Sequence, residues 1–303
     1  MFGESQPAWL SEGIGPAPRL QFRCRLDGGL AGMDCAREEG SLFAADNSGG
    51  VYRYDRRGSL TAVTRGQDGV RALSVSDDGS AVVCLIGPSR LAMLTGELQS
   101  RWQLDFHEQC LAAAVAAYGN YVVIAFANAE NLVVDCNRQQ ISQFTSIRPL
   151  GHISFVVESP DIVGAAEHAL LCRYSLKGKP EWDSSLGSNV GSLAVTADGR
   201  RIFLAGYNQG IQTYNGEGTA KKSFVVDGTV KCLAASASGK RIIAATVEGH
   251  LYWLDSDGEI VWTTGNVPDV VKVCCDPLGD WFVVGMQDGT VARCGWAELS
   301  PTA

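Results

Sequence analysis

Residues Val230–Trp262 read VKCLAASASGKRIIAATVEGHLYWLDSDGEIVW, and this stretch decides the fold. Four short, largely apolar segments alternate with turns that contain Gly239, Gly249 and Gly258. Glycine suits such turns because it adopts the positive φ that a tight hairpin needs. The second segment, RIIAAT, is rich in β-branched residues, which favour strands. The stretch therefore predicts a meander of four antiparallel strands.

The same pattern recurs along the chain at a step of 40 residues. Its first position is apolar in seven copies: Leu30, Val70, Cys110, Leu150, Val190, Val230 and Val270. The turn glycine after the first strand keeps the same frame in Gly79, Gly119, Gly199, Gly239 and Gly279. Trp102, Trp182 and Trp262 share one position of the fourth strand, which explains their separation by 80 residues. Seven copies match without an insertion.

These units predict an all-β fold, a seven-bladed β-propeller of four-stranded antiparallel blades. A unit of about 40 residues cannot cover both its faces alone, so units must stack, and radial stacking gives a propeller. We expect residues 1–20 to form an N-terminal arm and residues 21–303 a single domain. The last unit has only three strands, whereas RLQFRCRLD around Phe22 has the frame of a fourth. The N-terminal strand is therefore expected to close the ring, which removes two open edges.

From about residue 20 onward, the chain resembles the WD40-like and quinoprotein-like propeller superfamilies. The stretch Val230–Trp262 looks like a quinoprotein-type blade, and VGSLAVTADGRRIFLAGYNQGIQTY, which begins at Val190, looks like a WD-type blade. The Trp-Asp dipeptide that ends the third strand of WD repeats is missing. Cys274 and Cys275 are similar to adjacent cysteines near the cofactor of some quinone-dependent dehydrogenases. Those enzymes have eight blades and carry the pair in a loop, so we expect no cofactor.

The composition limits the classes of partner. A formal net charge of −8 disfavours a general affinity for nucleic acid or an anionic membrane. The sequence contains no export signal and no continuous apolar run long enough to span a membrane, so we expect a cytoplasmic protein. In such a reducing compartment the ten cysteines should be free and mostly buried. No CxxC pair or Cys/His cluster has zinc-ligand spacing, so we predict no metal site.

Catalytic motifs are also missing. The sequence has no G-x-S-x-G nucleophile elbow, no phosphate-binding G-x-x-x-x-G-K and no H-E-x-x-H. The four histidines have no sequence-adjacent partner that indicates catalysis. We therefore name no catalytic residue and do not expect an enzyme, although an enzyme that uses loop carboxylates stays open as an alternative.

One end of the propeller is expected to be acidic. In a four-stranded meander, the turn between strands two and three lies at the same end as the crossover to the next blade, and we call this the crossover face. Eleven acidic residues map there: Asp27, Asp46, Asp68, Asp105, Glu108, Glu130, Glu167, Asp227, Glu248, Asp269 and Asp288. Only Arg65, Arg90 and Arg148 oppose them in the same loops. The acids either keep the protein soluble or form a docking face for a cationic partner.

Three polar residues interrupt rows of small residues on the inner strands. Asp34 stands where other blades have serine, alanine or cysteine, and His152 and Lys272 interrupt a second row. Such residues either line the central channel as a binding site or are structural and hydrogen-bonded. We predict a non-catalytic protein-protein interaction scaffold that acts as a monomer and binds an unidentified, basic protein or peptide. The alternative is a small-molecule-binding or hydrolytic propeller that uses the channel mouth.

Overall fold

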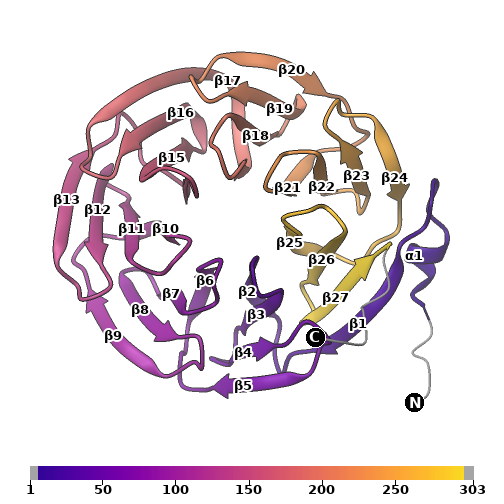
Figure 1. The fold of residues 1–303 in the computed structure, drawn as a ribbon, viewed down its shortest axis with the longest axis horizontal. Coiled ribbons are helices and arrows are strands. Elements are labelled where there is room, and N and C mark those ends of the chain that lie inside the picture. Colours follow the sequence, from indigo (N-terminus) through magenta and orange to yellow (C-terminus); the bar gives the residue numbers. More distant parts are fainter. Residues whose placement is uncertain (1–5, 297–303) are drawn as a thin grey trace.

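Seven four-stranded antiparallel blades surround one axis in the computed structural model, which describes residues 6–296 (Figure 1). The prediction of a seven-bladed propeller is confirmed. Blades 4 and 5 share one long strand, β17 (Pro180–Val195), which pairs with β16 through its first part and with β18 through its second. Hydrogen bonding therefore joins these two blades into one seven-stranded sheet.

Each blade runs from an inner strand beside the axis to an outer strand at the rim. Blade 1 contains β2 (Leu30–Ala36), β3 (Ser41–Asp46), β4 (Val51–Tyr54) and β5 (Leu60–Thr64). Blade 2 contains β6 (Val70–Val75), β7 (Ala81–Ile86), β8 (Arg90–Thr95) and β9 (Ser100–Asp105). Blade 3 contains β10 (Cys110–Val115), β11 (Tyr121–Phe126), β12 (Glu130–Asp135) and β13 (Gln140–Thr145). Blade 4 contains β14 (His152–Phe155), β15 (Asp161–Ala166), β16 (His168–Ser175) and the first part of β17.

The remaining blades follow the same order. Blade 5 contains the second part of β17, β18 (Arg201–Gly206), β19 (Gly210–Asn215) and β20 (Ala220–Phe224). Blade 6 contains β21 (Val230–Ala235), β22 (Arg241–Thr246), β23 (Leu251–Asp255) and β24 (Ile260–Thr264). Blade 7 contains β25 (Val270–Cys275), β26 (Trp281–Met286), β27 (Thr290–Gly295) and, as its outer strand, β1 (Arg19–Arg25).

The first strand completes the last blade, as predicted. β1 pairs antiparallel with β27, from Arg19 opposite Gly295 to Arg25 opposite Thr290. Figure 1 shows the indigo β1 beside the yellow β27. The pairing covers the edge of β27 that three strands alone would leave open.

The segment before β1 packs on the rim beside blade 6. The short helix α1 (Ala8–Ser11) buries Trp9 and Leu10 in the core between blades 6 and 7. Ile14 then pairs with Thr263 through two backbone hydrogen bonds, which adds a bridge to the outer strand β24. The N-terminal segment thus covers Trp262, which is completely buried.

The hydrophobic cores lie between neighbouring blades, and the outer strands add hydrogen bonds across them. Trp102 donates its indole N–H to the carbonyl of Cys136 at 2.8 Å, and Trp182 donates to Gly216 at the same distance. Ser142, in the same row, donates its hydroxyl to the carbonyl of Leu176 at 2.7 Å. Each acceptor lies 34 residues later, in the last hairpin of the next blade. The side chains of Trp102, Ser142 and Trp182 therefore link each of these blades to the next by a hydrogen bond.

No helix among the described residues is long and apolar enough to cross a membrane.

Candidate functional site

The crossover face is less negative than its loop sequences predict. Asp46, one of the eleven acids, is completely buried at the end of β3. It accepts hydrogen bonds from Gly28 N, Ser48 N and Oγ, Gly50 N and the Tyr52 hydroxyl. Burial alone would raise the pKa of Asp46, but these hydrogen bonds outweigh it and lower the pKa. Asp46 therefore fixes the turn between β3 and β4 and does not contribute to the exposed surface.

Four other acids of this face have a cation partner. The ion pairs are Asp27 with Arg65 at 2.5 Å, Asp105 with Arg90 at 2.7 Å, Asp269 with Lys231 at 2.5 Å, and Asp288 with Arg25 at 3.8 Å. Asp288 also accepts hydrogen bonds from Thr290 N and the Thr290 hydroxyl. The hydrogen bond from Arg90 holds the pKa of Asp105 below its usual value. These pairs reduce the charge that a partner would meet.

Two of these cations, Arg25 and Lys231, were not among the loop residues considered from the sequence, because they belong to the strands β1 and β21. Lys231 is the extra residue of a β-bulge at the start of β21, where Val230 and Cys232 pair with consecutive residues of β22. Arg71 occupies the same bulge position in β6, and its guanidinium donates to Gly87 O at 2.7 Å and to Cys110 O. A bulge re-aims a side chain, here toward the crossover face and the next blade. A search for basic residues at this bulge position could have found Lys231 and Arg71 from the sequence.

The remaining acids of the face have no cation partner among the described residues. They are Asp68, Glu108, Glu130, Glu167, Asp227 and Glu248. Glu248 accepts a hydrogen bond from Thr229 N at 2.7 Å, which lowers its pKa. Asp68, Glu167 and Asp227 are exposed on different blades. Glu108 and Glu130 differ from the others because the structure brings them to one groove.

This groove lies at the rim between blades 2 and 3 and has a volume of about 240 Å³. Phe106, Phe126 and Leu132 provide its apolar surface, and the two phenyl rings meet edge to face at 5.0 Å between centroids. Glu108 and Glu130 line the same groove. The Glu130 carboxylate accepts a hydrogen bond from the side-chain amide of Asn128 at 3.1 Å. The groove therefore combines an apolar surface with two carboxylates that no cation neutralises among the described residues.

His107, Gln140 and Gln143 also line this groove, which we call the blade 2–3 groove. The sequence analysis placed Glu108 and Glu130 on the acidic face but did not predict the groove. The apolar side chains belong to a crossover and to two different strands, so their proximity depends on how the blades pack.

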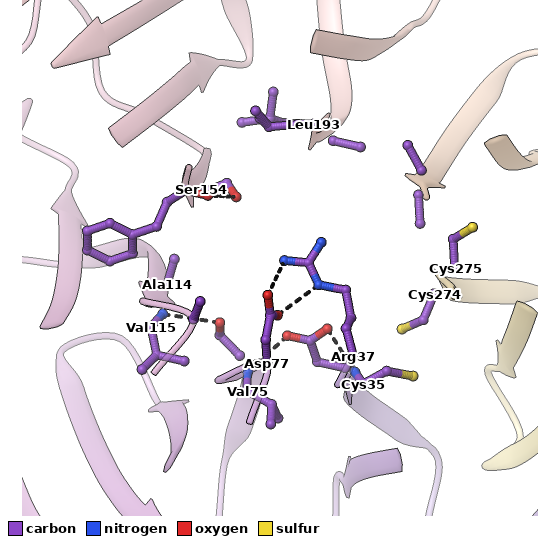
Figure 2. Close-up of a pocket in the computed structure, with 18 of the residues that line it drawn as sticks. Cys35, Arg37, Val75, Asp77, Ala114, Val115, Ser154, Leu193, Cys274 and Cys275 are labelled. Carbon is purple, nitrogen blue, oxygen red and sulfur yellow. Dashed lines mark hydrogen bonds and ion pairs between the residues drawn. The ribbon is translucent and has the colours of Figure 1, made fainter. Parts of the chain in front are cut away.

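Two of the three polar residues predicted on the inner strands, Asp34 and Lys272, line the central channel, whereas His152 is not among the residues that line it. The channel encloses about 230 Å³, and Figure 2 shows the residues around it. Asp34 Oδ1 accepts from Cys35 N and Asp34 Oδ2 from Val75 N, both at 2.9 Å, so its carboxylate joins blade 1 to blade 2. Burial raises the pKa of Asp34. His152 bonds through Nε2 to Val190 O at 3.3 Å, and burial lowers the pKa of its imidazole.

Arg37 and Asp77 form an ion pair at the same channel, which the sequence analysis missed. Arg37 Nε and Nη2 donate to the two carboxylate oxygens at 2.8 and 3.0 Å (Figure 2). The two residues are 40 apart and occupy the same position of successive blades. A search for opposite charges at the repeat step could have found this pair. Lys272 is exposed and has no ion-pair or hydrogen-bond partner among the described residues.

The structure therefore brings Asp34, Arg37, Asp77 and Lys272 to one channel, but three of them are already bonded within the protein. Among the described residues, no group of three or more His, Cys, Asp or Glu side chains could hold a metal ion. No disulfide joins cysteines among the described residues, and eight of the ten cysteines are buried and two half-buried.

Comparison with known proteins supports the fold. No protein-family model matches the chain, and no curated protein sequence matches it. Among solved structures, the chain is similar to the β-propeller domain of Cps50 (Swd1) from Myceliophteria thermophila, with a TM-score of 0.79 at 13% sequence identity. The match covers 92% of this chain and 100% of that domain. At this identity the similarity shows a β-propeller fold.

Proposed function

We propose that this propeller is a non-catalytic docking module that binds a basic protein segment at its crossover face. The observation that carries the proposal is the blade 2–3 groove, where Glu108 and Glu130 stand beside the apolar surface of Phe106, Phe126 and Leu132. A lysine or arginine side chain has an apolar stem and a cationic head. Such a side chain matches both parts of the groove, and its volume suits one side chain better than a folded domain.

The surrounding charge supports a basic partner. The chain carries a net charge of −8, and Asp68, Glu167 and Asp227 add further exposed carboxylates to the same face. A field of one sign raises the rate at which an oppositely charged partner arrives, and salt weakens it. We expect the module to act as a monomer in the reducing environment of the cytoplasm.

The alternative, a small-molecule-binding or hydrolytic site in the central channel, has less support. A catalytic or binding site needs convergent polar groups that are available to a ligand. In the channel, Arg37 and Asp77 bind each other, and Asp34 binds two backbone N–H groups. Lys272 alone leaves too little chemistry for a specific ligand.

A binding experiment tests the docking proposal. We would measure the association of the full chain with an immobilised lysine- and arginine-rich peptide, and with a glutamate-rich peptide of the same length, at low and high salt. The basic peptide should bind, more weakly as salt rises, whereas the acidic peptide should not. Glu108→Gln combined with Glu130→Gln should weaken binding roughly three- to tenfold, since each exposed charge contributes modestly.

A matched control separates the groove from net charge. Glu217 and Glu259 are exposed at the opposite end of the propeller. Glu217→Gln with Glu259→Gln removes the same charge and should leave binding nearly unchanged. Equal weakening by both double variants would show that only net charge matters. Unchanged binding in the Glu108→Gln, Glu130→Gln variant would exclude the groove. Phe106→Ala, which removes part of the apolar surface, should weaken binding without changing the charge.

A further inference from the structure

Two cysteines from opposite ends of the chain face each other between the first and last blades. Cys35 lies on β2, the inner strand of blade 1, and Cys274 lies on β25, the inner strand of blade 7. Both belong to the hydrophobic core between these blades, together with Met33 and Val291. Both also line the central channel, and Figure 2 shows them on neighbouring strands of its wall.

The repeat explains why the two thiols meet. Asp34 on blade 1 accepts a hydrogen bond from Val75 N of blade 2, and Ser74 on blade 2 accepts one from Val115 N of blade 3. Cys274 occupies the position of Asp34 and Ser74, one blade before blade 1. Its side chain is therefore directed at the residue that corresponds to Val75 and Val115, which is Cys35.

The raised pKa of Cys35 also indicates that the Cys274 thiol is close to it. The pKa of the Cys35 thiol is raised well above the usual value, first by the Cys274 thiol and then by burial. Cys275, the neighbour of Cys274 along the strand, points to the other side. It lies in the core between blades 6 and 7, and its Sγ contacts the carbonyl of Asp276 at 3.4 Å. Successive residues of a strand face opposite sides, so Cys275 does not compete for Cys35.

We propose that Cys35 and Cys274 are a disulfide-forming site that locks the ring when the protein meets a small aliphatic disulfide such as oxidised glutathione. Both thiols are free in the structure. The cross-link would join β2 and β25, the inner strands of blades 1 and 7. At the outer side of blade 7, β1 pairs with β27.

The reaction is thiol-disulfide exchange in two steps. The Cys274 thiolate attacks one sulfur of the small disulfide, which forms a mixed disulfide and releases one small thiol. The Cys35 thiolate then attacks Sγ of Cys274, forms the Cys35–Cys274 bond and releases the second small thiol. The two protein thiols lose two electrons and two protons in total, and the small disulfide gains them. Cys274, which is 6% exposed against 2% for Cys35, is the more accessible first nucleophile.

The cross-link should stabilise the ring. A disulfide restricts the unfolded chain more strongly when it closes a longer loop. Positions 35 and 274 enclose most of the 303 residues. The bond would also oppose separation of blades 7 and 1 by adding a covalent link to the hydrophobic core between them and to the pairing of β1 with β27.

The experiment treats the folded full chain with oxidised glutathione and maps its disulfides by digestion without reduction. A peptide that links Cys35 to Cys274, with the intact mass lowered by two hydrogens, supports the proposal. The melting temperature should rise by several degrees and return to its starting value after reduction. A link between other cysteines, glutathione addition without an internal link, or a cross-link that does not raise the melting temperature overturns it.

Variants that follow the repeat keep the test interpretable. Cys274→Ala introduces the residue that blades 3, 5 and 6 carry at this position, as Ala114, Ala194 and Ala234, so the fold should tolerate it. This variant should form no Cys35 cross-link and show no rise in melting temperature on oxidation. Cys275→Ala, the matched control, should behave like the wild type. If Cys274→Ala still gains stability with glutathione, or Cys275→Ala loses the cross-link, the assignment of the pair is wrong.

Discussion

The channel wall of blades 7, 1 and 2 differs from that of blades 3 to 6, although the same repeat builds both. The wall formed by blades 7, 1 and 2, which we call the polar arc, carries Lys272, Cys274, Asp34, Arg37 and Asp77. The wall formed by blades 3 to 6, which we call the apolar arc, consists mainly of alanine and large aliphatic residues. In the polar arc, side chains join neighbouring blades, as Asp34 does through Val75 N.

In the apolar arc, loop backbones also join neighbouring blades, beside the side-chain hydrogen bonds of His152 and Ser192 to the next blade. Ala197 N donates to Ala237 O at 2.8 Å, and Ala237 N donates to Pro277 O at 2.9 Å, so the loops of blades 5, 6 and 7 bond directly to one another. Between blades 1 and 2 both devices occur, because Glu38 N also donates to Asp77 O at 2.9 Å. The comparison shows that polar side chains at the repeat position of Asp34 hydrogen-bond the backbone of the next blade, as Asp34 and Ser74 do. Polar residues there are therefore weak evidence for a ligand.

The largest effect should come from removing the strand that completes blade 7, beside the polar arc. Deletion of residues 1–27 removes β1, Trp9 and Leu10, which uncovers β27 and part of the core between blades 6 and 7. We expect loss of soluble, folded protein because an exposed strand edge promotes aggregation. Soluble yield and thermal melting measure this. Deletion of residues 1–18, which keeps β1, should lower the melting temperature but leave a folded protein. A 1–27 deletion that melts like the full chain would contradict completion by β1.

A smaller effect is expected where a side chain joins two blades. Asp34→Ala leaves Val75 N and Cys35 N without their acceptor and should cost about 1–3 kcal/mol of unfolding free energy. Asp34→Ser imitates Ser74, whose hydroxyl accepts from Val115 N at 3.3 Å, and should recover part of the loss. Urea unfolding provides the measurement.

The matched change in the apolar arc is Ala194→Ser, at the same repeat position as Asp34. It should alter the unfolding free energy by less than about 0.5 kcal/mol, because no existing bond is lost. Equal effects at positions 34 and 194 would mean that the two arcs do not differ in how they are held together.

The sequence predicted the blades well because their period is local. Each glycine turn and the apolar pattern of each strand lie within a single 40-residue unit, and the frame match at Phe22 was enough to predict the pairing of β1 with β27. The merging of blades 4 and 5 through β17 was not predictable, because it depends on the path of one crossover.

The candidate site was predicted less completely because charge depends on side-chain direction. The loop sequences assigned Asp46 to the surface, but its burial requires Gly28 and Tyr52, which only the folded blade brings to it. Likewise, Lys231 neutralises Asp269 because a bulge turns it toward the crossover face. The groove at Glu108 and Glu130 needs two blades packed together. Strand and turn patterns within one repeat could be predicted from the sequence, whereas side-chain contacts between repeats could not.

The smallest effect should come from Lys272, the charged residue of the polar arc without a bonded partner among those described. Its ammonium lies near the Asp34 carboxylate and lowers the pKa of Asp34 in opposition to burial, which raises it overall. Lys272→Ala gives the residue of Ala72 and Ala112 and should cost less than about 0.5 kcal/mol at neutral pH.

The pH dependence of this small cost identifies its origin. Because the folded pKa of Asp34 lies above its usual value of 3.8, protonation of Asp34 stabilises the fold below 3.8, and this contribution is lost as pH rises through the folded pKa. Lys272 attracts only the ionised carboxylate, so the cost of Lys272→Ala should vanish at low pH and reach its full value above the folded pKa. Urea unfolding across this range measures it. In an Asp34→Asn background the acid-range dependence should disappear. If it persists there, another neighbour of Lys272, such as His152, is responsible, and the polar arc is not coupled through Asp34.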